Sequence, residues 1–274
     1  MRALFPHINP NQTYQIPVSD GHVLYVEESG APNGIPVVYC HGGPGGGSDP
    51  IYRRFYDPEK YRIIQFDQRG CGQSTPHCAN DINAVWHNKT SDLTNDMEII
   101  RQQLNIKKWV VAGGSWGSTL ALMYAIEYPE QVMGLILRGI FLARQQDIDW
   151  LFSNKLGASQ VFPEHYQAFV KGHDFDSVQE LLESYYDQLT GDNDLVQLAA
   201  AKQFNSWEGK ISKVVPDDLS STLTNKEFIA SALLNCHYFT NNSFMYECEI
   251  LSEISRIKDI PGYIIHGRYD MVCK

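Results

Sequence analysis

The sequence is short of the features that mark several large classes of protein. Lys and Arg number 22 against 32 Asp and Glu among 274 residues, which leaves a formal net charge of −10 at pH 7. Nucleic acids and anionic membranes attract basic surfaces, so this deficit argues against binding to either. No apolar run is as long as a membrane span, and the first residues contain no apolar core of a secretion signal. We therefore expect a cytoplasmic protein with no nucleic-acid or membrane partner.

The six cysteines show neither a disulfide pattern nor metal-site spacing. They stand at positions 40, 71, 78, 236, 248 and 273, with no C-x-x-C pair and no cluster of Cys with His. A chain of this length that is 43% hydrophobic can bury a core without disulfides. We expect buried free thiols, no metal site and no organic cofactor.

Short apolar and β-branched runs recur along the chain, each followed by glycine or by the start of a helix-like pattern. They cover residues 37–40, 63–66, 109–112, 134–137 and 263–265. Continuous apolar runs of this length are typical of strands buried on both faces, as in parallel sheets. Helical periodicity separates them, for example at Leu93, Met97 and Ile100. This alternation predicts an α/β protein with a mostly parallel, doubly wound sheet.

One long stretch interrupts the alternation. From about residue 141 the strand-like runs stop, and helix-period segments such as Val178, Leu181, Leu182, Tyr185 and Leu189 take their place. A helical insertion of about a hundred residues is within the size range of a domain. We predict an N-terminal part of the core at 1–140, a helical cap at 141–250 and a second part of the core at 251–274.

The chemistry-bearing motif is Gly113-Gly114-Ser115-Trp116-Gly117, which fits G-x-S-x-G between a predicted strand and a predicted helix. In that context the motif forms a nucleophile elbow, a strained turn that needs small flanking residues. The amides at the start of the helix point at negative charge that develops on the substrate. Ser115 is therefore the candidate nucleophile.

Two further segments complete the expected site. His41-Gly42-Gly43-Pro44-Gly45 follows an earlier strand, where hydrolases of this type place the second half of the oxyanion hole. The backbone N–H groups of Gly43 and Trp116 would be the two donors. Asp270 follows the last predicted strand, which is where the triad order Ser, Asp, His places the acid.

Four segments in this order, H-G-G-P-G-G-G, D-Q-R-G-C-G-Q-S, G-G-S-W-G-S-T-L-A-L and H-G-R-Y-D-M-V-C, closely resemble the proline iminopeptidase family of α/β hydrolases. The resemblance runs along the whole chain. It implies a serine peptidase with a helical cap that releases N-terminal proline from peptides through a prolyl-Ser115 ester. By this likeness Asp270 orients the base, and Gly43 and Trp116 hold the oxyanion.

The resemblance also implies substrate-binding residues. Carboxylates of the cap recognise the free imino terminus in this family, and Glu208 in the segment N-S-W-E matches one of them. Asn235 replaces the family's second Glu, which predicts weaker affinity for the cationic terminus because an amide carries no charge. Phe141 and Phe239 match aromatic positions around the proline ring, although core packing explains either residue equally well.

The family's catalytic His lies beyond one more helix and strand, in a segment that does not occur among the four residues after Asp270. Without a base to take the Ser115 proton, the 274-residue chain should be inactive or strongly impaired, and marginally stable. A shortened form of a working enzyme and a non-catalytic binding relative both explain this, and the intact elbow, loop and acid favour the first. An esterase or amidase of the same fold is the remaining alternative, whereas an epoxide hydrolase usually carries Asp at the elbow.

Overall fold

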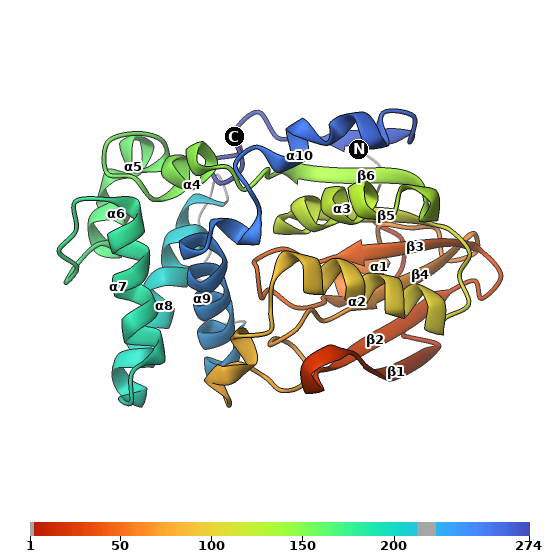
Figure 1. Ribbon diagram of the computed structural model, residues 1–274, viewed down its shortest axis with the longest axis horizontal. Coiled ribbons are helices and arrows are strands. Elements are labelled where there is room, and N and C mark those ends of the chain that lie inside the picture. The colour runs from red at the N-terminus through yellow and green to blue at the C-terminus, as the bar shows by residue number, and fades with distance from the viewer. Residues whose placement is uncertain (1–2, 213–222) are drawn as a thin grey trace.

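The computed structural model describes residues 3–212 and 223–274 (Figure 1). Within these residues, seven strands form one sheet in the order β1-β2-β4-β3-β5-β6-β7. Their bounds are β1 Gln12–Pro17, β2 Val23–Gly30, β3 Ile35–Cys40, β4 Tyr61–Phe66, β5 Trp109–Ser115, β6 Val132–Ile140 and β7 Gly262–Ile265. Strands β4, β3, β5, β6 and β7 pair in parallel, whereas the β1–β2 and β2–β4 pairs are antiparallel. The predicted α/β fold with a mostly parallel sheet is confirmed.

Helices surround this sheet in two groups. Helices α2 and α3 lie along one face of the sheet (Figure 1), and α3 is buried along almost its whole length. Helices α4 to α9 gather on the left of the view, where β6 leads into α4. The bounds are α1 Pro50–Arg53, α2 Thr90–Gln103, α3 Trp116–Glu127, α4 Gln145–Phe152, α5 Ala158–Val161, α6 Pro163–Phe169, α7 Val178–Thr190, α8 Asp194–Ile211, α9 Asn225–Thr240 and α10 Glu249–Ser252.

The core of the helical group is aromatic. Phe152, Phe169 and Phe204 contact one another with ring centroids 5.7–5.9 Å apart. The ring of Tyr185 stacks on Phe169 at 5.2 Å. Offset and edge contacts of this kind stabilise a core beyond the area that they bury. The helix-period residues predicted within 178–189 therefore belong to a packed layer, while the division into 1–140, 141–250 and 251–274 stays a prediction.

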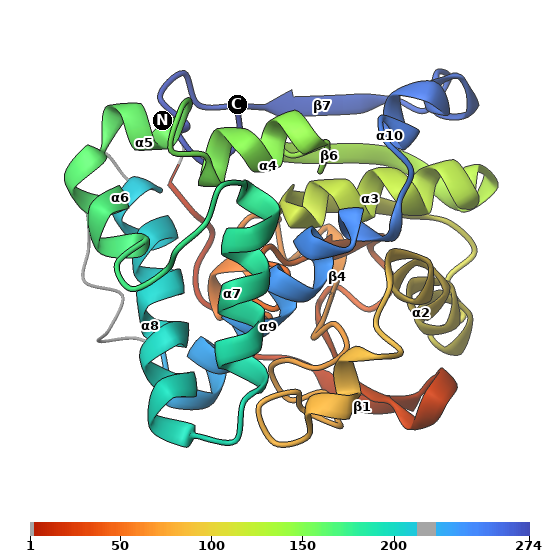
Figure 2. The same ribbon diagram turned by 60° about the vertical axis from the view of Figure 1, so that its left-hand side comes forward.

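Strand β7 departs from the sequence expectation. The run 263–265 was expected to be buried on both faces, but Tyr263 and Ile264 are 75% and 67% exposed. Strand β7 is the last of the sheet and pairs only with β6 (Figure 2). Its side chains lack the helical cover that encloses β3 and β5. An apolar run predicts a strand here correctly, but it does not report which neighbours cover that strand.

The cysteines follow the expectation with one exception. Five are buried free thiols, whereas Cys248 is exposed. Among the described residues, no group of three or more His, Cys, Asp and Glu side chains is placed to hold a metal ion. In the same residues, no helix is both long and apolar enough to cross a membrane.

Candidate active site

Ser115 lies on a strained turn between β5 and α3. Its backbone has φ 55° and ψ −129°, a conformation that L-residues rarely adopt. The turn requires glycine at the neighbouring positions, because a side chain there would clash with the backbone. A Cβ on Gly113 would lie 2.1 Å from the carbonyl oxygen of Gly117, and one on Gly117 would lie 2.1 Å from that of Cys40. The geometry is that of a nucleophile elbow, with the hydroxyl at the carboxyl end of a central strand.

The glycine-rich loop after β3 lies directly against this turn. A Cβ on Gly42 would be 3.2 Å from the Gly114 carbonyl oxygen and 3.5 Å from the Ser115 Cβ. Gly43 has φ 119°, which favours glycine. Hydrogen bonds from Gln68, which follows β4, hold the start of this loop. The Gln68 backbone N–H donates to His41 Nε2 at 3.0 Å, and the Gln68 side chain donates to the His41 carbonyl at 2.9 Å. His41 is buried, which lowers its pKa, so it is a neutral support of the loop.

The segment that carries Asp270 also reaches the nucleophile. Asp270 Oδ1 accepts hydrogen bonds from the backbone N–H groups of Val272 (3.1 Å) and Cys273 (2.8 Å). The Cys273 thiol contacts the Ser115 hydroxyl oxygen at 3.7 Å. Burial, with the Asp270 charge second, raises the pKa of Cys273 to about 12, so the thiol stays protonated. Asp270 and Ser115, the candidate acid and nucleophile, are thus brought to the same end of the sheet.

His266 is the histidine beside Asp270, and its hydrogen bonds fix its tautomer. Nδ1 accepts from the Ile140 backbone N–H at 3.2 Å, so the proton sits on Nε2, which donates to the Cys273 carbonyl at 2.7 Å. Both ring nitrogens are therefore occupied by backbone groups. Among residues 3–212 and 223–274, no histidine ring is hydrogen-bonded to Ser115.

A cavity of about 250 Å³ opens above Ser115. Gly43 and Ser115 line it from the sheet, and Glu208 on α8 and Ser231 on α9 line it from the helical group. Desolvation, followed by the charge of Asp270, raises the pKa of Glu208 to about 7. Glu208 is held by its neighbour Trp207, which is buried and donates from Nε1 to the Leu151 carbonyl at 3.0 Å. A carboxylate that is short of water faces the nucleophile across a small cavity.

The other predicted binding residues lie around this cavity without lining it. Phe141 and Phe239 are buried and meet edge to face at 5.8 Å, as expected for a packed aromatic pair. Asn235 is buried, and its amide donates to the Pro44 carbonyl at 3.0 Å and to the Ser231 carbonyl at 2.9 Å. The amide therefore contacts the glycine-rich loop. No sequence motif indicated this contact.

The sequence analysis did not predict several residues of the cavity wall, and Tyr52, Arg138 and Asn205 have the largest side chains among them. A signal existed for two of them. Arg138 is a charged residue near the carboxyl end of a parallel strand, and Asn205 stands three residues before Glu208, one helical turn away. Tyr52 belongs to the four-residue helix α1 and carried no such signal.

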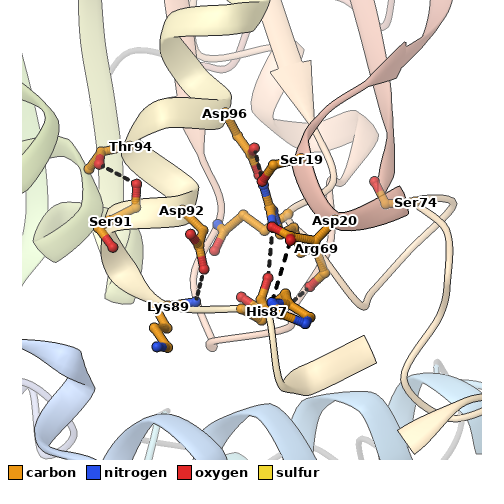
Figure 3. Close-up of polar contacts among 12 residues, drawn as sticks. Ser19, Asp20, Arg69, Ser74, His87, Lys89, Ser91, Asp92, Thr94 and Asp96 are labelled. Carbon is orange, nitrogen blue, oxygen red and sulfur yellow. Dashed lines mark hydrogen bonds and ion pairs between the residues drawn. The ribbon is translucent and has the colours of Figure 1, made fainter. Parts of the chain in front are cut away.

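A buried ion pair supports the loop that follows β4. Arg69 binds Asp96 of α2 through two hydrogen bonds of 2.7 Å and also donates to the His87 carbonyl and to Ser19 (Figure 3). Asp67 in the same loop accepts from the backbone N–H groups of Ser48 and Gln73. These residues fix loops next to the site, and none of their hydrogen bonds goes to Ser115.

Comparison with known proteins shows the fold and the family of the chain. Residues 35–273 match the family model described as alpha/beta hydrolase fold. The chain is 45% identical over 276 residues to a Leptolyngbya boryana protein named "Probable proline iminopeptidase", with all of this chain and 84% of that protein covered. It is 43% identical to the proline iminopeptidase of Xylella fastidiosa (strain Temecula1), with all of this chain and 86% of that protein covered. Among solved structures, VinJ shares the fold with a TM-score of 0.61 at 18% identity, covering 96% of this chain and 84% of that one.

The sheet, the serine elbow and the family match define an α/β hydrolase. Within that class, the identity to curated relatives over the full chain shows that the chain belongs to the proline iminopeptidase family. It is a proline iminopeptidase-type hydrolase.

Proposed function

We propose that this protein releases N-terminal proline from peptides by acyl transfer to Ser115. The observation that carries the proposal is the shared cavity, in which the strained Ser115 faces the desolvated carboxyl group of Glu208. The relatives named proline iminopeptidase support the same substrate class.

In the proposed reaction the Ser115 hydroxyl attacks the prolyl carbonyl and forms an ester, and the amine of the next residue leaves with a proton. Water then hydrolyses the ester and regenerates Ser115. The backbone N–H groups of Gly43 and Trp116 stabilise the oxyanion, because Gly43 lines the same cavity as Ser115 and Trp116, the first residue of α3, has an N–H without an intrahelical acceptor. Asp270 orients the base.

Glu208 is the proposed ligand of the cationic imino terminus. Glu208 is half-buried and has a pKa of about 7, so a cation that binds beside it stabilises its carboxylate and lowers this pKa again. Asn235 brings no second charge, so the affinity for the free terminus rests on Glu208. Phe141 and Phe239 are proposed to shape the side of the pocket that holds the proline ring.

The proton of Ser115 needs an acceptor, and His266 does not serve because backbone groups occupy both of its nitrogens. Loss of the base lowers turnover by a serine protease about 10⁶-fold, so the proposed reaction requires a base other than His266. Peptides with N-terminal proline are the proposed partners, and the cytoplasm is the proposed compartment.

The test compares hydrolysis of proline 4-nitroanilide by three chains. These are the 274-residue chain, the same chain extended by the part of the Leptolyngbya boryana relative that follows the residue matching Lys274, and Ser115→Ala in the extended chain. Turnover that appears with the extension and vanishes with Ser115→Ala supports the proposal. Equal turnover by the serine and alanine forms would contradict it.

A further inference from the structure

One face of α9 lies against both halves of the proposed oxyanion hole. At the glycine-rich loop, a Cβ on Gly45 would lie 2.9 Å from Leu234 Cδ1 and 3.1 Å from the Ala230 carbonyl oxygen, so the loop backbone packs on the helix. The Asn235 amide donates to the Pro44 carbonyl from the same face. One turn further, the ring of Tyr238 lies 4.6 Å from the ring of Trp116. Helix α9 therefore touches the neighbour of Gly43 and the side chain of Trp116.

The helix is itself tied to the sheet side of the molecule. The Tyr238 hydroxyl donates to Asn88 Oδ1 at 2.6 Å, and His237 Nε2 donates to the Asn88 carbonyl at 2.9 Å. Asn88 in turn donates to the Arg69 carbonyl at 2.9 Å, next to the buried pair of Arg69 with Asp96. All of these side chains are buried. Because these bonds fix the C-terminal half of α9, the helix can hold the glycine-rich loop that it contacts in one position.

We propose that Asn235 is a positioning residue that holds the oxyanion loop in its working geometry. The proposal rests on the proposed function of Ser115, Gly43 and Trp116. Both hydrogens of the Asn235 amide are used, one on Pro44 and one on Ser231, so the amide has no donor left for a substrate. A carboxylate at this position cannot donate to the Pro44 carbonyl at all.

The expected size of the effect follows from the oxyanion hole. Removing one oxyanion donor from a serine protease lowers turnover by about 10²–10³. Loss of the Asn235 contact leaves the Gly43 N–H in place but less firmly aimed, so a smaller loss of about 10–100-fold is expected. The loss should fall on the acylation rate, because binding of the prolyl ground state does not use the oxyanion donors.

The experiment measures acylation of Ser115 in the 274-residue chain by proline 4-nitrophenyl ester. The ester bond to Ser115 forms, the bond to nitrophenolate breaks, and the serine proton passes to water. Because nitrophenolate leaves without a proton, this step depends less on a base than amide hydrolysis does. The concentration dependence of nitrophenolate release gives the acylation rate constant and the apparent Kd separately.

Two variants of Asn235 are compared with a matched control. Asn235→Ala removes the donor, and Asn235→Asp keeps the shape but cannot donate to Pro44. Thr90→Val is the control, since buried Thr90 also bonds across the molecule, to the Ser243 carbonyl at 2.5 Å, without contact to the loop. We expect both Asn235 variants to acylate at least tenfold more slowly than Thr90→Val. Acylation within twofold of Thr90→Val would overturn the proposal, and so would an effect of Asn235→Ala confined to Kd.

Amide hydrogen exchange tests the same proposal without any acylation of Ser115. Amide hydrogen exchange of residues 42–48 should accelerate at least tenfold in Asn235→Ala and stay unchanged in Thr90→Val, and equal exchange in all three chains would overturn the proposal. Failure of the proposed function would look different: wild type would gain no prolyl mass, or Ser115→Ala would release nitrophenolate equally fast.

Discussion

The centre and the edge of the sheet hold the two predicted catalytic side chains in different ways. Ser115 ends β5, a strand flanked on both sides and buried along most of its length. Asp270 follows β7, an edge strand of four exposed residues. The nucleophile is positioned by close backbone packing, whereas two backbone N–H groups position the acid. The comparison predicts that substitutions at the centre of the sheet destabilise the fold, whereas substitutions at the edge strand have little effect on stability.

Two glycines test this contrast most strongly. Gly117→Ala places a Cβ 2.1 Å from the Cys40 carbonyl oxygen, a clash that no side-chain movement relieves. We expect a loss of about 3 kcal/mol or more in the free energy of unfolding, although Ala ordinarily favours a helix over Gly. In Gly262→Ala on β7 the nearest atom is 3.7 Å away, and we expect a change below about 1 kcal/mol. Urea unfolding of both variants gives the difference, and equal losses would refute the contrast.

Glu208 extends the comparison to the enclosed cavity. Its folded pKa of about 7 lies above the ordinary value of 4.5, so the folded state resists ionising it. The stability that this raised pKa represents is complete below pH 4.5 and is lost as the pH rises through 7. Glu208→Gln should therefore leave stability unchanged at pH 4.5 and increase it by about 1–3 kcal/mol at pH 8.

The measurement is the free energy of urea unfolding at both pH values. The same substitution at Glu164 on α6, whose side chain is 69% exposed, provides the matched control variant, Glu164→Gln. A Glu208→Gln variant that is equally stable relative to wild type at both pH values would show that the cavity does not desolvate the carboxylate. The same variant should raise the KM for proline amides in the extended chain.

The smallest effect on stability is expected at the edge strand. Ile264→Lys replaces a side chain that is 67% exposed, so the free energy of unfolding should change by less than about 0.5 kcal/mol. Aggregation should fall clearly, because a lysine on an apolar edge strand opposes pairing with another copy. Leu195→Lys on α8, at an 80% exposed position, is the control for light scattering. An equal reduction in light scattering by both variants would show that aggregation does not proceed through β7.

The sequence predicted the fold and the strained turn that carries Ser115, because both depend on local patterns. Apolar runs define β3, β4 and β5, and the glycines around Ser115 are required by contacts within a few residues and with the adjacent strand. The exposure of Tyr263 could not be predicted, since it depends on which elements lie over β7. The hydrogen bond from Asn235 to Pro44 joins residues 191 positions apart, and no motif in either segment indicates it. Arg138 was missed because a charged residue near the end of a strand can serve many purposes, such as an ion pair or solvent exposure.

The central claim, that Ser115 forms an ester with proline held by its free imino group, has a direct test. The 274-residue chain is incubated with the 4-nitrophenyl esters of proline and of N-acetylproline, and the peptide containing Ser115 is analysed by mass spectrometry. The account predicts that the proline ester adds one prolyl group to Ser115, that N-acetylproline reacts at least tenfold more slowly, and that Ser115→Ala gains no mass at this peptide. Equal labelling by the two esters, or a prolyl group on another residue, would contradict it.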